Sequence, residues 1–209
     1  MNTCMQRRCC LALGFLLLGL AISGCGEDKD SAADRAEAVK EAAGEGVAQL
    51  TAADEALVTQ VANIAAALEK DTIAVSVIAA QNEIGTIQDI VAIARMVHKY
   101  GGLFHTDAVQ AVGKIPVDVQ KANIDLLVIS GHKIGAPKGV GAIYIRRGTR
   151  MSALIHGGHQ ERNRRAGTQN VAGIAGLGKA CELALAELEN YYSRVRGLRD
   201  RLEDGVLSQ

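Results

Sequence analysis

Polar side chains able to do chemistry stand just after three apolar runs of the sequence, at 72–78, 103–106 and 125–129. These side chains are Asn82, Glu83, Asp107, Gln110, Ser130, His132 and Lys133. If the apolar runs are strands of an open α/β sheet, the residues that follow them gather at the carboxyl edge, where such sheets bind ligands. The sequence therefore predicts a site that combines carboxylates, an amine, a hydroxyl, an imidazole and carboxamides.

This combination meets the needs of pyridoxal phosphate. The cofactor requires a lysine for its Schiff base, an acid that keeps its ring nitrogen protonated, and donors for its phosphate. Lys133 and Asp107 are candidates for the first two tasks, and Ser130 and His132 for the third. Two simpler interpretations stay open, since Lys133 could be a solvated loop lysine and Asp107 could cap a following short helix.

The elements that must position these residues alternate between strand and helix. Apolar residues recur at helical spacing over 87–97, and Gly101 and Gly102 end that helix before the run at 103–106. A further apolar run at 140–145 predicts another strand, and the chain is helical from about Thr168 to its end. Continuous apolar strands separated by helices predict an α/β fold with a mostly parallel sheet and flanking helices.

Composition limits the classes of function. The 209 residues are 48% hydrophobic and carry 23 basic and 23 acidic side chains, which favours one globular domain with extra sequence. There is no Trp and there are only 2 Phe, so aromatic stacking with nucleic acid bases is not expected. The basic cluster at Arg162, Arg164 and Arg165 therefore favours a phosphate or subunit contact.

The cysteines mark off the N-terminal segment. Residues 1–25 have Arg7 and Arg8, then an apolar run over 9–22, then the ending Ser23-Gly24-Cys25, which is typical of a signal peptide with a bacterial lipobox. We expect Cys25 to be acylated and to anchor the chain to a membrane, with an ordinary cleaved signal or an amphipathic anchor as the alternatives. Only one cysteine follows it, which excludes a disulfide framework and leaves no metal site.

Residues 26–70 are predicted to be a helical tether, and residues 71–209 the folded part. Ser31 and Thr51 each precede an acidic residue by three positions, as N-caps do. Within the folded part, His105 is expected to be a hydrogen-bonded core histidine. Cys181, among Ala and Leu on a helix, is expected to be a small packed residue.

Five ordered motifs carry a resemblance to a known family. They are NEIGTIQDI at 82–90, FHTDAVQAVGK at 104–114, SGHK at 130–133, APKGVGAIYIRRG at 136–148, and HGG, ER and RRAGT between 156 and 168. Between about Asp71 and Gly205 the chain resembles the cysteine desulfurases of the class V aminotransferase group. The resemblance implies that the folded part is an incomplete large domain of a PLP-dependent transferase with the type I fold.

Carried onto this sequence, the resemblance assigns roles residue by residue. It implies that Lys133 forms the Schiff base, that Asp107 pairs with the ring nitrogen and that Gln110 bonds the phenolic oxygen. It implies that Ser130 and His132 bind the phosphate and that Asn82 lies near the ring oxygen and the substrate carboxylate. Thr168 would reach a phosphate in a partner subunit, which implies a homodimer.

The resemblance also implies a reaction. Cysteine desulfurases transfer sulfur from L-cysteine, giving L-alanine, to a sulfur-acceptor protein for iron-sulfur cluster or thiocofactor assembly. Their loop thiol and their carboxylate-binding arginine have no counterpart in these 209 residues, so this chain alone is expected to be poorly active. Alternatives are another class V lyase or aminotransferase, a non-catalytic lipoprotein binding module, and a cytoplasmic rather than membrane-anchored location.

Overall fold

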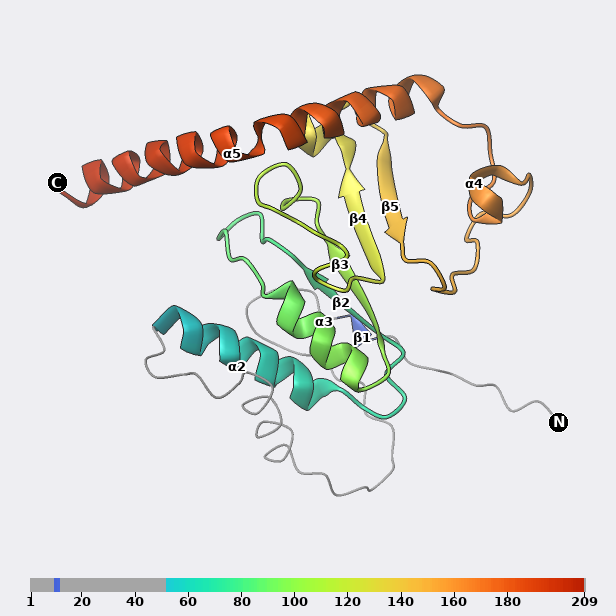
Figure 1. The fold of residues 1–209 in the computed structure, drawn as a ribbon, viewed down its shortest axis with the longest axis horizontal. Coiled ribbons are helices and arrows are strands. Elements are labelled where there is room, and N and C mark those ends of the chain that lie inside the picture. The colour runs from blue at the N-terminus through green and yellow to red at the C-terminus, as the bar shows by residue number, and fades with distance from the viewer. Residues whose placement is uncertain (1–9, 12–51, 209) are drawn as a thin grey trace. The chain divides into compact units, whose positions relative to one another are not determined.

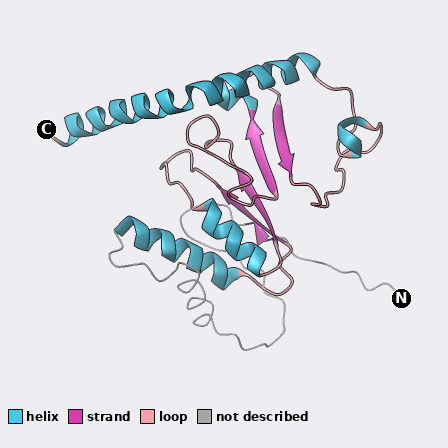
Figure 2. Cartoon of the chain, viewed as in Figure 1, coloured by secondary structure: helices cyan, strands magenta, loops and turns pink. Residues whose placement is uncertain are grey.

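The structure is a computed structural model that describes residues 10–11 and 52–208 (Figure 1). The chain divides into two units, which are described separately. The first contains the residues up to Asp107 together with Asp118–Leu127, and the second contains Ala108–Val117 and Val128–Gln209. Strands and helices alternate along the described residues, as the sequence predicts (Figure 2).

The first unit is built on three parallel strands in the order β1-β2-β3. They are β1 (Cys10–Leu11), β2 (Ala74–Ile78) and β3 (Leu103–Asp107). Val75 pairs in register with Phe104 and Ser76 with His105. Burial alternates along β2 and β3 rather than being continuous, because their second face carries the half-buried polar residues Ser76 and His105.

Two helices complete the first unit. Helix α3 (Ile90–Lys99) begins at Asp89, whose Oδ1 accepts a hydrogen bond from the Ala92 N–H at 2.9 Å. Its buried residues pack on β2 and β3, and they are Ile93, Ala94, Met96 and Val97. Helix α2 (Ala52–Ala67) packs on α3 through a face that includes the buried Val61 and Ala65. Part of the segment predicted as a tether thus contributes to this core.

A buried carboxylate joins α3 to β3. Asp125 Oδ2 accepts the Phe104 N–H at 2.8 Å and lies 2.6 Å from His98 Nε2. Asn123 Nδ2 lies 2.8 Å from the other ring nitrogen of His98. Because a buried carboxylate is stable only when its oxygens are hydrogen-bonded, this cluster fixes the end of α3 against the sheet.

The second unit contains the end of β4 (Leu126–Ser130) and β5 (Gly141–Ile145). The two strands are neighbours, and their arrows point in opposite directions in Figure 1. Together with the parallel β1, β2 and β3, this gives the mostly parallel sheet that the sequence predicts. Gly141 is required at this pair, because a Cβ there would lie 2.6 Å from the Ile129 carbonyl oxygen.

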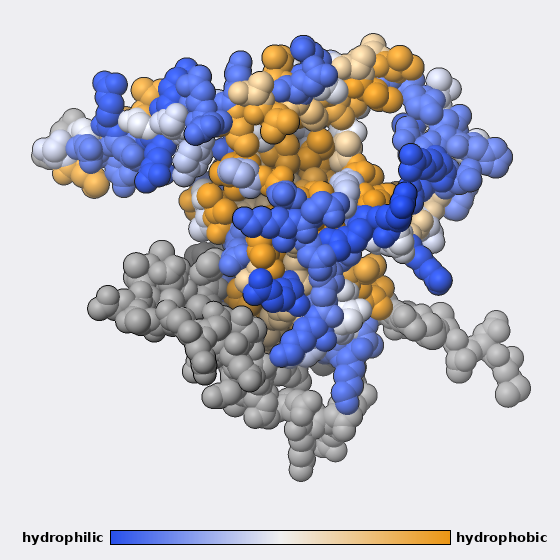
Figure 3. Space-filling model, in the orientation of Figure 1, coloured by the Kyte–Doolittle hydropathy of each residue, from blue (hydrophilic) through white to orange (hydrophobic). Residues whose placement is uncertain are grey.

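Helix α5 (Val171–Leu207) dominates the second unit. The Asn170 side chain caps it by accepting the Gly173 N–H at 3.0 Å. Its first turns bury Leu177 and Ala180 against Ala136. The later turns present a mainly hydrophilic surface (Figure 3), with separate exposed apolar residues such as Leu202.

None of the described helices is long and apolar enough to cross a membrane. Apart from Cys10 and Leu11, which form β1, the predicted leader lies outside the described residues, as does Cys25. The leader and its lipidation site therefore stay predictions.

Replacing Ile93 by alanine should destabilise the first unit by about 2–5 kcal/mol, because the side chain is fully buried at 0% exposure and its loss leaves a cavity. Ile84→Ala is the matched control, since Ile84 is 63% exposed and should change stability by less than about 0.5 kcal/mol. Urea unfolding followed by circular dichroism measures both variants. Equal midpoints for the two would show that the α3 core is wrongly placed.

Candidate active site

A short 3₁₀ helix, η1 (Gly131–Ile134), presents the predicted cofactor residues of the second unit. It starts directly after Ser130 at the end of β4, so His132 and Lys133 follow the strand within one turn. Gly135 ends the turn with φ 84°, a left-handed conformation that glycine adopts without steric cost. Its N–H and that of Ala136 both bond the Gly131 carbonyl. These two hydrogen bonds therefore fix the backbone of the turn.

Gly131 holds this turn against β5. Its N–H donates to the Val140 carbonyl at 2.9 Å, and a Cβ there would meet Val140 Cγ1 at 2.9 Å and Ala136 Cβ at 3.0 Å. A larger residue would have to push the turn away from the strand. Lack of space thus explains the glycine in the SGHK motif. Its contact with Val140 fixes the backbone from which Ser130 and His132 project.

The structure brings Ser130 and His132 together, as predicted for a joint phosphate site. Ser130 Oγ lies 2.8 Å from His132 Nδ1. The side chains of His132 and Lys133 are exposed, whereas Ser130 is half-buried. While the hydroxyl and the neutral imidazole are paired in this way, one of their two protons remains to be donated to an anion, beside the amine of the next residue.

A turn over 108–117 places Gln110 in the same unit. Gly113, with φ +77°, lets this turn approach η1, since a Cβ there would lie 3.0 Å from Ile134 Cγ2. Gln110 Oε1 accepts a hydrogen bond from Lys114 Nζ at 3.3 Å. Burial, and secondly the positive charge of Lys133, lower the pKa of Lys114 below its usual value. The two amines therefore lie within range of each other's charge.

Asn82 lies in the first unit at the tip of a tight turn. The side-chain oxygen of Gln81 accepts the N–H groups of Glu83 and Ile84, at 2.5 and 2.6 Å, and Gly85 has φ +73°. Asn82 is exposed on this turn. The structure thus places it beyond the end of β2, at the carboxyl end predicted from the sequence.

Asp107 is the last residue of β3, and its carbonyl accepts the Ala79 N–H at 2.8 Å. It lies in the first unit with Asn82, whereas Gln110, Ser130, His132 and Lys133 lie in the second. The predicted core histidine is confirmed, because the half-buried His105 Nδ1 lies 2.6 Å from Ser76 Oγ. Ser76 was not predicted as a functional residue, and the only signal in the sequence is that it is the one serine in the run at 72–78.

Thr168 is exposed in the loop between α4 (Gln160–Asn163) and α5. Within α4, just before this loop, three successive non-glycine residues have positive φ, at 48°, 55° and 64°: Glu161, Arg162 and Asn163. Arg165 Nη1 donates to the Gly167 carbonyl at 3.2 Å and so fixes the backbone just before Thr168. A phosphate contact across a dimer by Thr168 stays a prediction.

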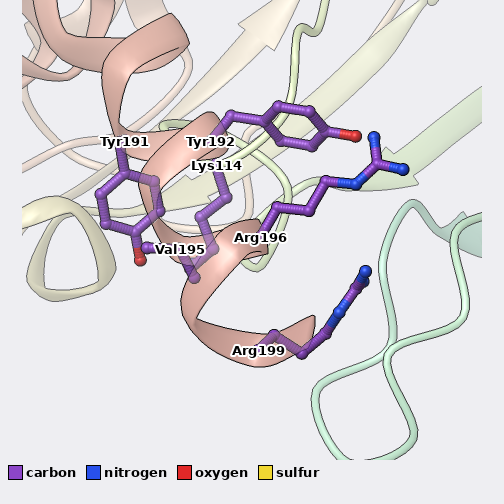
Figure 4. A pocket seen from close by; sticks show the side chains of 6 residues that line it. All are labelled: Lys114, Tyr191, Tyr192, Val195, Arg196 and Arg199. Carbon is purple, nitrogen blue, oxygen red and sulfur yellow. The ribbon is translucent and has the colours of Figure 1, made fainter. Parts of the chain in front are cut away.

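A surface pocket of the second unit lies between the turn at 108–117 and α5 (Figure 4). Its lining residues are Lys114, Tyr191, Tyr192, Val195, Arg196 and Arg199. Arg196 and Arg199 extend to one side of the helix, away from Lys114 and Tyr191. Asp200 pairs with Arg199 and lies 3.9 Å from Arg196. The cations therefore do not converge on one point, and this pocket is not the candidate site.

Cys181 is half-buried on α5 and packs against the cluster of Ala136, Leu177 and Ala180. This agrees with the prediction of a small packed residue. A thiol in this position is held by a rigid helix.

Comparison with known proteins assigns the chain to a family. The aminotransferase class-V profile matches residues 27–208. A cysteine desulfurase of Gluconacetobacter diazotrophicus is 56% identical over 143 residues, covering 68% of this chain and 36% of the relative. Cysteine desulfurase NifS of Azotobacter vinelandii is 53% identical over 144 residues, covering 69% and 36%. The solved structure of a NifS-like protein superimposes with a TM-score of 0.65 at 45% identity, covering 68% of this chain and 39% of that one.

The fold is that of a PLP-dependent transferase of the type I class, with part of its large domain present. The chain belongs to the class V aminotransferase family. It spans little more than a third of the length of the curated relatives it matches. The family profile begins at residue 27, well before the first of the five motifs at 82–90.

The proximity of the two lysines predicts an effect on reactivity. Because the pKa of Lys114 is lowered, more of its amine is neutral at a given pH, and replacing Lys133 by methionine removes one cause of that shift. We expect acylation of Lys114 near pH 8 to slow about two- to fivefold in Lys133→Met. Competitive labelling and peptide mass spectrometry measure this rate, with the exposed Lys138 as internal control. An unchanged ratio of Lys114 to Lys138 labelling would rule out the electrostatic coupling.

Proposed function

We propose that this chain is the central part of a PLP-dependent cysteine desulfurase. The observation that carries the proposal is the hydrogen-bonded pair Ser130–His132 directly before Lys133, on a turn that Gly131 locks against β5. Relatives that bear the name cysteine desulfurase at 53–57% identity support the choice of this activity among class V reactions.

The residues present fit pyridoxal phosphate in their chemistry. The phosphate needs neutral or cationic donors at a fixed backbone, which Ser130 and His132 provide. The aldehyde needs an exposed amine nearby, and Lys133 is the next residue and is exposed. Gln110, from the turn that packs on Ile134, offers a carboxamide in the same unit.

When bound, the cofactor supplies an electron sink for the bonds at the substrate's α-carbon. In this proposal the Lys133 Nζ would hold the cofactor at its aldehyde carbon, and the free Lys133 amine would move the proton at the substrate's α-carbon. Asp107 holds the proton on the ring nitrogen, so that the ring can accept electrons. Ser130 and His132 orient the ring through its phosphate, Gln110 bonds the phenolic oxygen, and Asn82 orients the substrate carboxylate.

The proposed substrate is L-cysteine, with alanine as the carbon product and a sulfur-acceptor protein as the final partner. The sulfur nucleophile is not assigned to Cys181, because that thiol packs within α5 and cannot travel to an acceptor. We also propose a homodimer, in which Thr168 on its exposed loop contacts a phosphate bound by the partner subunit.

Lys133→Ala should abolish the visible absorbance that the purified protein acquires with pyridoxal phosphate, because the covalent attachment is lost. The measurement is an absorbance spectrum after gel filtration, together with borohydride reduction and peptide mass spectrometry. Lys138→Ala is the matched control, since Lys138 is an exposed lysine on the following loop and should leave the spectrum unchanged. Equal visible absorbance in wild type and Lys133→Ala would show that Lys133 is not the residue that binds the cofactor.

For the N-terminal segment we propose a membrane-anchored lipoprotein, supported by the basic start, the apolar run over 9–22 and Cys25. The alternative is a cytoplasmic chain, which the sulfur-transfer chemistry favours. The anchor concerns only how the folded part is held at a membrane, so the two proposals are tested independently.

Cys25→Ala should release the protein from the membrane fraction, because acylation of that thiol is the proposed anchor. Cys9→Ala and Cys10→Ala are matched controls, as both lie in the same leader and should leave the chain with the membranes. Mass spectrometry of the mature N-terminus gives the direct measurement. An intact Met1 in the soluble fraction of wild type would contradict the anchor.

A further inference from the structure

A polar pair lies on one face of the parallel strands in the first unit. Ser76 of β2 and His105 of β3 are register partners, and Ser76 Oγ lies 2.6 Å from His105 Nδ1. Asp107 follows His105 by two residues on the same strand, so its side chain stands on the same face, about 7 Å further along. The opposite face carries the buried Phe104 and Thr106.

The environment of His105 favours a neutral ring. Burial lowers the pKa of His105 below its usual value, and the negative charge of Asp107 opposes this to a smaller extent. A neutral ring whose Nδ1 accepts the Ser76 hydroxyl proton is satisfied without a charge. At a pH where Asp107 is ionised, the imidazole beside it therefore does not cancel its charge.

Strand β2 and helix α3, which pack beside β3, do not bring another charged side chain against His105. Strand β2 has no titratable side chain. The side chains of α3 that are buried against β2 and β3 are apolar, and they are Ile93, Ala94, Met96 and Val97. The charged and titratable side chains of α3 are Arg95, which is exposed, His98, which pairs with Asp125, and Lys99, which is exposed at the helix end. Among the described residues, Asp107 is the charged group whose field acts on His105.

We propose that Ser76 and His105 are positioning residues: they keep a neutral imidazole beside Asp107, so that no positive charge on the imidazole offsets the attraction between that carboxylate and the protonated ring nitrogen of the cofactor. The inference rests on the proposed function, since it assigns Asp107 to the ring nitrogen. It adds a regulation of that same site by pH. Acidification that protonates His105 adds a positive charge beside Asp107 and weakens the hold on a cationic ring.

The first test needs no cofactor. NMR titration of the His105 imidazole in the unliganded protein should show a lower pKa in Asp107→Asn than in wild type, because a raising influence is removed. The pKa should rise in Ser76→Ala, which removes the hydroxyl that stabilises the neutral ring, and Ser76→Thr should restore the wild-type value. An unchanged His105 titration in Asp107→Asn or in Ser76→Ala would overturn the proposal.

The second test measures cofactor retention. Affinity for pyridoxal phosphate, followed by absorbance, is compared at one pH above and one pH below the His105 pKa that the NMR titration measures. Wild type should lose about tenfold more affinity than His105→Asn, whose side chain stays neutral throughout. His156→Asn, a change at an exposed histidine, is the control and should behave as wild type.

The outcomes separate the two proposals. Normal binding with the same pH dependence in wild type and His105→Asn would overturn this inference and leave the proposed function standing. Absence of binding by wild type at either pH would overturn the proposed function and the cofactor role inferred here together. Circular dichroism of each variant shows that the comparison is made between folded proteins.

Discussion

The close contact of Gly131 with β5 is the constraint on which the candidate site depends. No Cβ fits between its backbone and Val140, and the hydrogen bond from its N–H to the Val140 carbonyl fixes the turn. Ser130 and His132 meet because they flank this residue, and Lys133 is presented because the 3₁₀ turn carries it out of the strand. A residue without a side chain, Gly131, thus determines where the side chains of Ser130, His132 and Lys133 are placed. The same logic applies at Gly113, where the turn that bears Gln110 approaches Ile134.

Much of the fold could be predicted because its elements have strong local signals. The β-branched run before Ile78, the helical spacing up to Val97 and the apolar run at 125–129 each correspond to an observed element within a few residues. The start of α3 was missed by three residues, since the sequence alone does not show that Asp89 caps it. The alternating burial of β2 was also missed, because it depends on which residues of another strand lie opposite. Register is a long-range property that local periodicity cannot supply.

The candidate site could likewise be predicted only in part from the sequence. Residues that follow strands, such as Asp107 and Lys133, could be found from type and position. Contacts between segments distant in sequence could not, and these include the pairing of Ser76 with His105 and the influence of Lys133 on Lys114. Both involve groups whose charge is set by burial, and burial is decided by the whole fold. Sequence therefore indicated which groups could act, while the structure showed which neighbours control their charge.

The order of the two units along the chain has a consequence for biosynthesis. Residues 118–127 belong to the first unit although they follow 108–117, which belong to the second. Asp125, which bonds the Phe104 N–H and His98, comes from that returning segment. A ribosome must therefore release residue 127 before the first unit can complete its core, by which time part of the second unit has already emerged. The two units are interleaved in folding order, and no single cleavage point separates them.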